Sequence, residues 1–259
     1  LAEFAFRADG SYKFAKSHRW GFFPSLSLGW LVSEESWFRG ALPNIDKFKI
    51  RGSVGLLGRD NTTAFLYKRL MSLTTVPTYI IGDSYNPVYG LYTSNSIPSV
   101  ALTWEKTQTW NGGIELTAWN GLLSADLDAF YKYTYDILEN VSSTYPPSLG
   151  GNYPSTINSG SVSVKGFELV LGHRNRIQKV NYNVEGSLTY AKNKVLSRLQ
   201  SSNIPEWQSV IGRPIGELRG YKAIGLYRTQ EQLDNRPDGP GGTQRLGDIM
   251  YEDINGDGK

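Results

Sequence analysis

The segment from Leu123 to Tyr135 reads LSADLDAFYKYTY and alternates between two kinds of residue. Every second position is apolar or aromatic, and the positions between are mostly polar or charged. Successive side chains of a β-strand point to opposite faces of its sheet, so this period predicts a strand with one apolar and one polar face. The apolar set is Leu123, Ala125, Leu127, Ala129, Tyr131, Tyr133 and Tyr135, and the polar set includes Ser124, Asp126, Asp128 and Lys132.

The same period returns in other parts of the chain. It follows Trp20 and Asp46, precedes Trp119, and returns after Lys179. The apolar positions there include Phe22, Leu26, Leu28 and Trp30, then Phe48, Ile50, Val54 and Leu56, then Trp110, Ile114 and Leu116, and finally Val180, Tyr182, Val184, Leu188 and Tyr190. The pattern predicts an all-β protein with about seven long strands. They are expected to begin near Leu1, Trp20, Lys47, Ala101, Leu122, Gly160 and Lys179.

Two features separate these strands from those of a soluble sandwich, which alternate as well. Charged or strongly polar residues occupy the polar faces over their full length, as the lining of a water-filled lumen would. Aromatic residues bracket the apolar faces, Phe22 with Trp30 and Tyr182 with Tyr190. Eight residues at roughly 3.3 Å each, tilted by about 40°, rise on the order of 20 Å, close to the apolar band of transmembrane barrels. The pattern favours an antiparallel up-and-down transmembrane β-barrel.

The predicted connections alternate between short and long. Asn120-Gly121 is typical of a type I′ hairpin turn, and residues 173–179 form another short connection. Long connections cover residues 58–99, residues 140–159 and the chain after Lys192. Outer-membrane barrels have this asymmetry, with short periplasmic turns and long extracellular loops. Pro24 is the one objection, because proline lacks the N–H that a strand ladder uses.

Seven strands without a closing partner form an open sheet, whose edges would be unpaired in lipid. The chain is therefore predicted to form a partial barrel that belongs to a larger one. Residues 1–192 are assigned to the transmembrane β-barrel segment, and residues 193–259 to an extracellular loop region of the same barrel domain, truncated. One alternative is a soluble β-sandwich carbohydrate-binding module. A second is a β-rich glycoside hydrolase, which needs two carboxylates beside a cleft.

Composition excludes several classes of site. The 259 residues include no Cys, which excludes a disulfide scaffold, a CxxC zinc site and a thiol nucleophile. The net charge of +3 comes from scattered Lys and Arg, so the basic stripe of a nucleic-acid-binding protein is absent. No run of 18 apolar residues predicts a transmembrane helix, and the first residues lack the pattern of a signal peptide.

Catalytic constellations are also absent from the sequence. His18 and His173 both fall in predicted connections, far apart along the chain. No nucleophile elbow, partnered base or phosphate-binding loop accompanies them. We therefore expect no enzyme activity and name no catalytic residue.

The last residues, DINGDGK from Asp253 to Lys259, match the start of a Ca²⁺-binding loop. Oxygen side chains at alternate positions, here Asp253, Asn255 and Asp257, can point at one hard cation, and the following Gly258 permits a sharp turn. The backbone carbonyl of Lys259 would be a further ligand. The other interpretation is a solvated turn. No cofactor other than this Ca²⁺ is expected.

A series of motifs carries a further likeness. In chain order they are RADGSYKF (7–14), RWGFFPSLSLGW (19–30), KIRGSVG (49–55), WEKTQTWN (104–111), FYKYTYDIL (130–138), KGFEL (165–169), TYAKNKV (189–195), GRPIG (212–216), YKAIGL (221–226) and GDIMYEDINGDG (247–258). In this order, and over nearly the whole chain, they resemble the C-terminal barrel of SusC/RagA-type TonB-dependent outer-membrane transporters.

The resemblance implies a protein of the Gram-negative outer membrane that imports oligosaccharides or peptides. It implies energy supply through TonB, a SusD-like surface lipoprotein as partner, and contact with outer-membrane lipid. The plug, the TonB-contacting segment and the closing strands of such a transporter would lie outside these residues. Tyrosines in the long connections could stack on sugars or pack their own loops, so no substrate-binding residue is named. They are Tyr79, Tyr85, Tyr89, Tyr92, Tyr145 and Tyr153.

Overall fold

One antiparallel sheet of seven strands dominates the computed structural model. The chain forms two compact units, Leu1–Ile215 and Gly216–Lys259, and the sheet belongs to the first. The structure describes residues 1–73, 79–81, 86–88, 91–93, 97–141, 148, 154–201, 203–236, 243–254 and 256.

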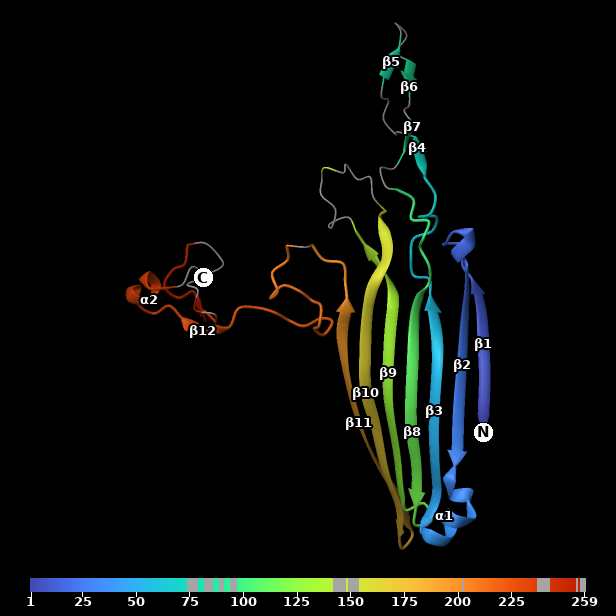
Figure 1. The fold of residues 1–259 in the computed structure, drawn as a ribbon. Coiled ribbons are helices and arrows are strands. Elements are labelled where there is room, and N and C mark those ends of the chain that lie inside the picture. The colour runs from blue at the N-terminus through green and yellow to red at the C-terminus, as the bar shows by residue number, and fades with distance from the viewer. Residues whose placement is uncertain are drawn as a thin grey trace. The chain divides into compact units, whose positions relative to one another are not determined.

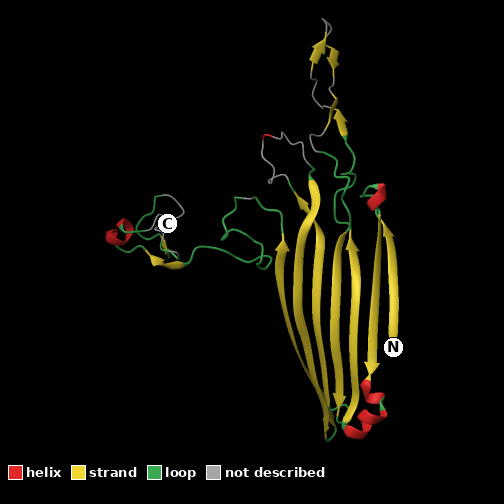
Figure 2. Cartoon of the chain, viewed as in Figure 1, coloured by secondary structure: helices red, strands yellow, loops and turns green. Residues whose placement is uncertain are grey.

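The seven strands lie side by side in the order β1-β2-β3-β8-β9-β10-β11, so each pairs with its nearest long neighbours in the sequence (Figures 1 and 2). This up-and-down order confirms the predicted fold class, and within the described residues the sheet does not close on itself. The strands are β1 (Ala2–Gly10), β2 (Trp20–Leu31), β3 (Ile45–Arg59), β8 (Glu105–Ala118), β9 (Leu123–Asn140), β10 (Thr156–Ile177) and β11 (Val180–Ser197).

The alternation places the strands well, and the main difference concerns one hairpin. Residues 173–177 were predicted to be part of a connection, which is wrong: they extend β10, and Ile177 pairs with Val180 of β11. The turn contains only Gln178, whose φ is 52°, and Lys179. His173 is therefore a strand residue, with its ring centroid 5.5 Å from that of Tyr182. β11 also continues past Lys192 to Ser197, and the assignment of residues 193–259 to an extracellular loop region stays a prediction.

The short connections gather at one end of the sheet. Between β2 and β3 lie the 3-10 helix η2 (Val32–Glu34) and the helix α1 (Ser36–Ala41), where Phe38 stacks on Phe48 with a centroid distance of 5.5 Å. Between β8 and β9, Asn120 and Gly121 have φ values of 55° and 76°, and Leu122 N–H donates to Trp119 O. The positive φ values of Asn120 and Gly121 have the signs of the predicted type I′ turn. Trp119 also has a φ of 56°, and the connection between the paired residues Ala118 and Leu123 is four residues long rather than two.

The long connections leave the opposite end of the sheet. The 3-10 helix η1 (Lys16–His18) follows β1, and the chain from β3 to β8 contains two small strand pairs. A cluster of buried side chains lies near this end: Phe14, Phe23, Leu102 and Trp104. The small pairs are β4 (Met71–Leu73) with β7 (Leu91–Thr93) and β5 (Tyr79–Ile81) with β6 (Asn86–Val88).

Pro24 fits the sheet because pairing between β2 and β3 ends at Ser25. The residue before Pro24, Phe23, extends its ring over Gly58, where an added Cβ would lie 1.9 Å from the ring. The missing proline N–H therefore falls where the ladder to β3 has already stopped.

The second unit is small. It contains β12 (Ala223–Leu226), α2 (Gln230–Asp234) and β13 (Ile249–Tyr251), and β12 pairs with β13. Thr229 and Gln232 form a capping box at the start of α2, in which each side chain accepts a backbone N–H from the other's position.

The sandwich alternative is wrong for this fold. A sandwich would bury the apolar side chains between two sheets. In the described residues the seven-stranded sheet leaves its apolar side chains in the open, with Phe4 65% and Leu188 56% exposed. Such a surface is stable only against another apolar medium or partner.

Candidate functional site on the polar face of the sheet

Strand register sorts the side chains of the sheet into two continuous faces. Phe4, Leu26, Val54, Trp110 and Tyr131 are paired in sequence across five strands, so they share one face. The residues beside them in each strand share the other face, which is mostly polar. We call these the apolar face and the polar face. A membrane barrel has this arrangement, with lipid on one side and the lumen on the other.

An ion-pair network crosses the polar face near the short connections. Arg51 of β3 donates from Nη1 to Glu115 Oε1 of β8 at 2.6 Å and from Nε to Asp128 Oδ1 of β9 at 3.2 Å. Its Nη2 donates to the second Asp128 oxygen. Lys47 and Lys49 also reach Glu115, at 2.5 and 3.2 Å. The network therefore joins three neighbouring strands by charge-assisted hydrogen bonds.

Gly113 makes the contact between Arg51 and Asp128 possible, which crosses the middle strand of the three. It lies between Arg51 and Asp128 in the register, on the middle strand of the three. A Cβ at Gly113 would lie 2.2 Å from Asp128 Oδ1 and 2.8 Å from Arg51 Nε. The guanidinium and carboxylate therefore meet directly above a backbone that has no side chain.

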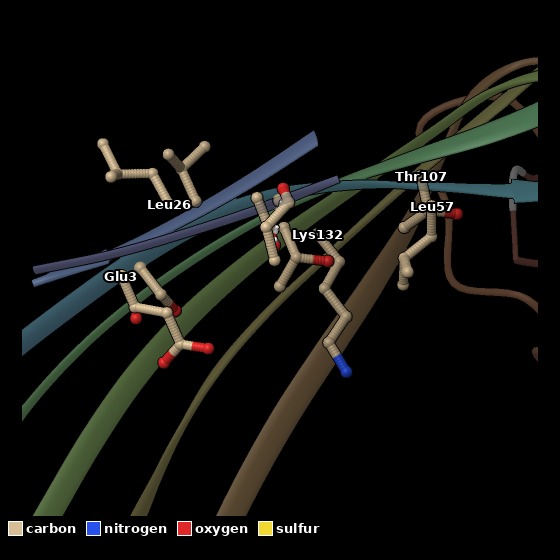
Figure 3. A pocket seen from close by; sticks show the side chains of 12 residues that line it. Glu3, Leu26, Leu57, Thr107 and Lys132 are labelled. Carbon is tan, nitrogen blue, oxygen red and sulfur yellow. Dashed lines mark hydrogen bonds between the residues drawn. The ribbon is translucent and has the colours of Figure 1, made fainter. Parts of the chain in front are cut away.

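A hollow of about 560 Å³ lies toward the long connections (Figure 3). Its floor consists of small side chains from four strands, and Glu3, Leu57 and Lys132 extend from the polar face at its border. Leu26 lies on the opposite side of the sheet in Figure 3, so its side chain does not extend into the hollow. The hydroxyl groups of the floor can donate and accept hydrogen bonds, and they belong to Ser25, Ser27, Ser53, Thr107 and Thr109.

The predicted Ca²⁺ loop is described only in part. Asp253 Oδ1 accepts a hydrogen bond from Gly256 N–H at 2.7 Å, so the chain turns back over this carboxylate. Asn255, Asp257 and Lys259 lie outside the described residues. Among the residues that are described, no three His, Asp or Glu side chains gather as a metal-binding group. Ca²⁺ binding therefore stays a prediction.

Sequence reasoning did not identify the Arg51 network, although it placed Asp126 and Asp128 on one strand face. The signal was present in the alternate basic residues Lys47, Lys49 and Arg51 and in the acidic residues of later strands. Partners 64 and 77 residues apart can be matched only once the register is known. Of the tyrosines considered for binding, Tyr85, Tyr89, Tyr145 and Tyr153 lie outside the described residues, and the side chains of Tyr79 and Tyr92 do as well.

Comparisons with known proteins agree with this architecture. The chain is 31% identical over 250 residues to the TonB-dependent receptor SusC of Bacteroides thetaiotaomicron, which covers 90% of this chain and 24% of that protein. It is 29% identical over 236 residues to the TonB-dependent receptor P39 of Formosa agariphila, covering 90% of this chain and 22% of that protein. The chain thus spans about a quarter of the length of these relatives.

Solved structures share the fold. The RagAB peptide transporter matches with a TM-score of 0.68 at 21% identity, over 87% of this chain and 24% of that one. The RagAB peptide importer in its closed-closed state matches with a TM-score of 0.70 at 19% identity, over 97% of this chain and 28% of that one.

In the described part of this chain, no helix has the length and apolarity to cross a membrane.

A family model gives the assignment. The TonB-dependent receptor-like β-barrel model matches residues 3–250, nearly the whole chain. Receptors and transporters, rather than enzymes, make up this family, which agrees with the lack of a catalytic constellation in the sequence. With its open sheet, its two faces and its SusC-type motifs, the chain belongs to the TonB-dependent receptor-like β-barrel family.

Proposed function

We propose that this chain forms part of the wall of a TonB-dependent importer in the outer membrane. In this proposal the polar face lines the lumen and the apolar face contacts lipid. The observation that carries it is the division of the seven strands into one mainly apolar face and one mainly polar face, the polar face with the ion-pair network of Arg51. A lumen holds water and polar solutes, so its wall tolerates charge, whereas lipid does not.

The substrate class that we propose is an oligosaccharide or a peptide, taken up together with a SusD-like surface lipoprotein. The SusC-type motifs and the 31% identity to SusC support this assignment. The hollow beside Glu3 and Lys132 agrees with it, because its hydroxyl groups suit polar solutes of either kind. TonB would act through segments of the transporter outside this chain.

A pair of neighbouring residues in β3 tests the two faces. Ser53 is paired with Ser27 and Asn111 on the polar face, and Val54 is paired with Leu26 and Trp110 on the apolar face. Each is changed to Cys in the full-length protein and labelled with a fluorophore. We expect quenching by lipid-attached nitroxide at Val54→Cys and by water-soluble iodide at Ser53→Cys. The reverse pattern, or lipid quenching at both positions, would contradict the proposal.

Import itself is tested in the native host. Deletion of the gene should abolish growth on at least one polysaccharide or oligopeptide mixture supplied as sole carbon source, and the intact gene should restore it. Affinity purification of the full-length protein should recover a surface lipoprotein encoded beside it. Unchanged growth on every such source, with no lipoprotein recovered, would refute the proposed function.

A further inference from the structure

The apolar face changes its character at one level of β10 and β11. Phe167 and Tyr190 are paired there, with ring centroids 5.9 Å apart. The next pair on the same face, toward the long connections, is Lys165 with Lys192. Lys194 follows two residues further along β11. Two residues of a tilted strand rise by roughly 5 Å, so the basic side chains begin directly above the aromatic level.

These lysines have no acidic neighbour on their face of the described sheet. Lys165 is paired with Tyr131 on one side and with Lys192 on the other, and its neighbours along the strand are Ser163 and Phe167. Lys194 is paired with Ser163. All three lysines are exposed, and within the described residues none has a carboxylate within 4.0 Å.

Like charges directly opposite each other on neighbouring strands destabilise a sheet. The Lys165–Lys192 pair is therefore unfavourable by itself, and Lys194 adds a third positive charge. A nearby anion would attract each ammonium group and so offset the repulsion between them. Since Lys165 is flanked on both sides by strands of this chain, the anion for Lys165 has to come from above the face rather than from an adjacent strand.

We propose that Lys165, Lys192 and Lys194 form a binding site for the phosphorylated headgroup of an outer-leaflet lipid. We call these residues the basic patch. The proposal rests on the proposed outer-membrane location, in which the long connections mark the outer surface. The acyl chains would lie along Leu188, Leu171 and Phe167, and the headgroup phosphate would lie at the basic patch. Tyr131 and Tyr190 stand at this level, where aromatic side chains favour the membrane interface.

Charge complementarity favours a lipid phosphate over a protein partner. The basic patch adjoins the apolar face without an intervening polar zone, so its ligand has to combine a negative charge with long apolar chains. Lysine stems pack along apolar surface while their ammonium groups reach toward the headgroups, which suits this boundary. Each basic side chain near an anionic membrane surface strengthens binding roughly fivefold, so the opposed pair contributes about 25-fold.

The test uses the full-length protein in nanodiscs of phosphatidylcholine, to which lipid A is added with or without its phosphates. The variant is K165Q/K192Q, and the matched control is K16Q/K179Q, which removes the same charge from a 3-10 helix and a turn. We expect phosphorylated lipid A to raise the Tm of the natural protein and of the control. The variant should lose this rise and bind phosphorylated lipid A about 25-fold more weakly.

The neutral membrane provides an internal check on the sign of the effect. In phosphatidylcholine alone, K165Q/K192Q should be as stable as the natural protein or more so, because the substitution removes a repulsion. A lower Tm of the variant in both membranes would show that the partner lies inside the protein, and would overturn the proposal. An equal rise with dephosphorylated lipid A, or with inorganic phosphate alone, would also overturn it.

This test is separable from the test of import. If the protein restores growth but does not respond to lipid A, the lipid-binding proposal is wrong and the import proposal stands. If it binds lipid A through the basic patch but restores growth on no substrate, the import proposal is wrong and the lipid-binding proposal stands.

Discussion

Lys49 and Lys192 both lie on long strands of one sheet, yet their surroundings differ in kind. On the polar face, Lys49 Nζ lies 3.2 Å from Glu115 Oε1, within a network where bases and acids compensate each other. On the apolar face, Lys192 stands opposite Lys165, with no acid beside either of them on that face of the described sheet. On the polar face the Arg51 network neutralises its charges internally, whereas the lysines of the apolar face leave the compensation to their surroundings.

The strongest way to break this contrast is to place a charge within the apolar face. Leu171→Arg in the full-length protein puts a guanidinium at a position that is 53% exposed in the sheet and paired with Gly186. We expect a loss of about 3 kcal/mol of unfolding free energy in lipid, because arginine near the middle of the bilayer is poorly solvated. Urea titration of the protein in vesicles measures it.

The matched control for that substitution is Ser187→Arg. Ser187 is paired with Val170 and lies on the polar face of the same hairpin. Its unfolding free energy should change little. A similar loss for both substitutions would show that the two faces do not differ in the membrane.

A second test disturbs the pairing of β10 and β11, the strands that carry the basic patch. Gly166→Ala would bring a Cβ within 2.2 Å of Tyr190 O, a backbone atom that cannot turn away. We expect a loss of about 2 kcal/mol, since overpacking forces the backbone to shift, together with a weaker response to lipid A. Gly186→Ala in the same pair of strands meets nothing within 4 Å and should leave both measurements unchanged.

A third test is directed at the polar face. Gly113→Ala would push Asp128 away from Arg51, and we expect a loss of about 1 kcal/mol, because partly exposed ion pairs contribute modestly. Gly112→Ala, one residue away on the opposite face, meets nothing within 4 Å. Equal unfolding free energies of the two variants, measured by urea titration, would show that the network does not stabilise the wall.

The smallest expected effect concerns the Ca²⁺ loop. In protein that continues past Lys259, calorimetry should detect Ca²⁺ uptake, and Asp253→Asn should weaken it because one charged ligand is lost. Asp248→Asn is the control, since Asp248 Oδ2 accepts from Arg245 N–H within its own turn. Absence of uptake by the unsubstituted protein would leave the solvated turn as the correct interpretation.

The sequence predicted the strands well, because alternation is a local property. Trp20 and Leu123 begin strands within a residue of where the pattern placed them, whereas β8 and β10 begin at Glu105 and Thr156, four residues from the predicted starts. It failed at His173, since the polar run after Gly172 resembles a turn, whereas the ladder continues to Ile177. His173 is part of that ladder, paired with Val184, and its ring centroid lies 5.5 Å from that of Tyr182.

The functional surfaces were less accessible to sequence reasoning than the strands were. Each lysine of the basic patch could be assigned to a strand from the sequence. Which lysines lie opposite each other depends on the strand register, and a shift of one residue would change every pair. The same is true of Arg51 and Asp128, which meet only because Gly113 lies between them. The Arg51 contacts join segments 64 and 77 residues apart, whereas the lysine pair depends on the register of the β10–β11 hairpin.

The two-residue turn at Gln178 and Lys179 has a consequence for the order of assembly. It joins β10 to β11 with almost no loop to close, whereas residues 60–104 separate β3 from β8. Closing a longer loop costs more chain entropy, and local pairings form sooner. We expect the β10–β11 hairpin to form early and the Arg51 network late, so a newly inserted wall would engage its lipid before its lumen surface is complete.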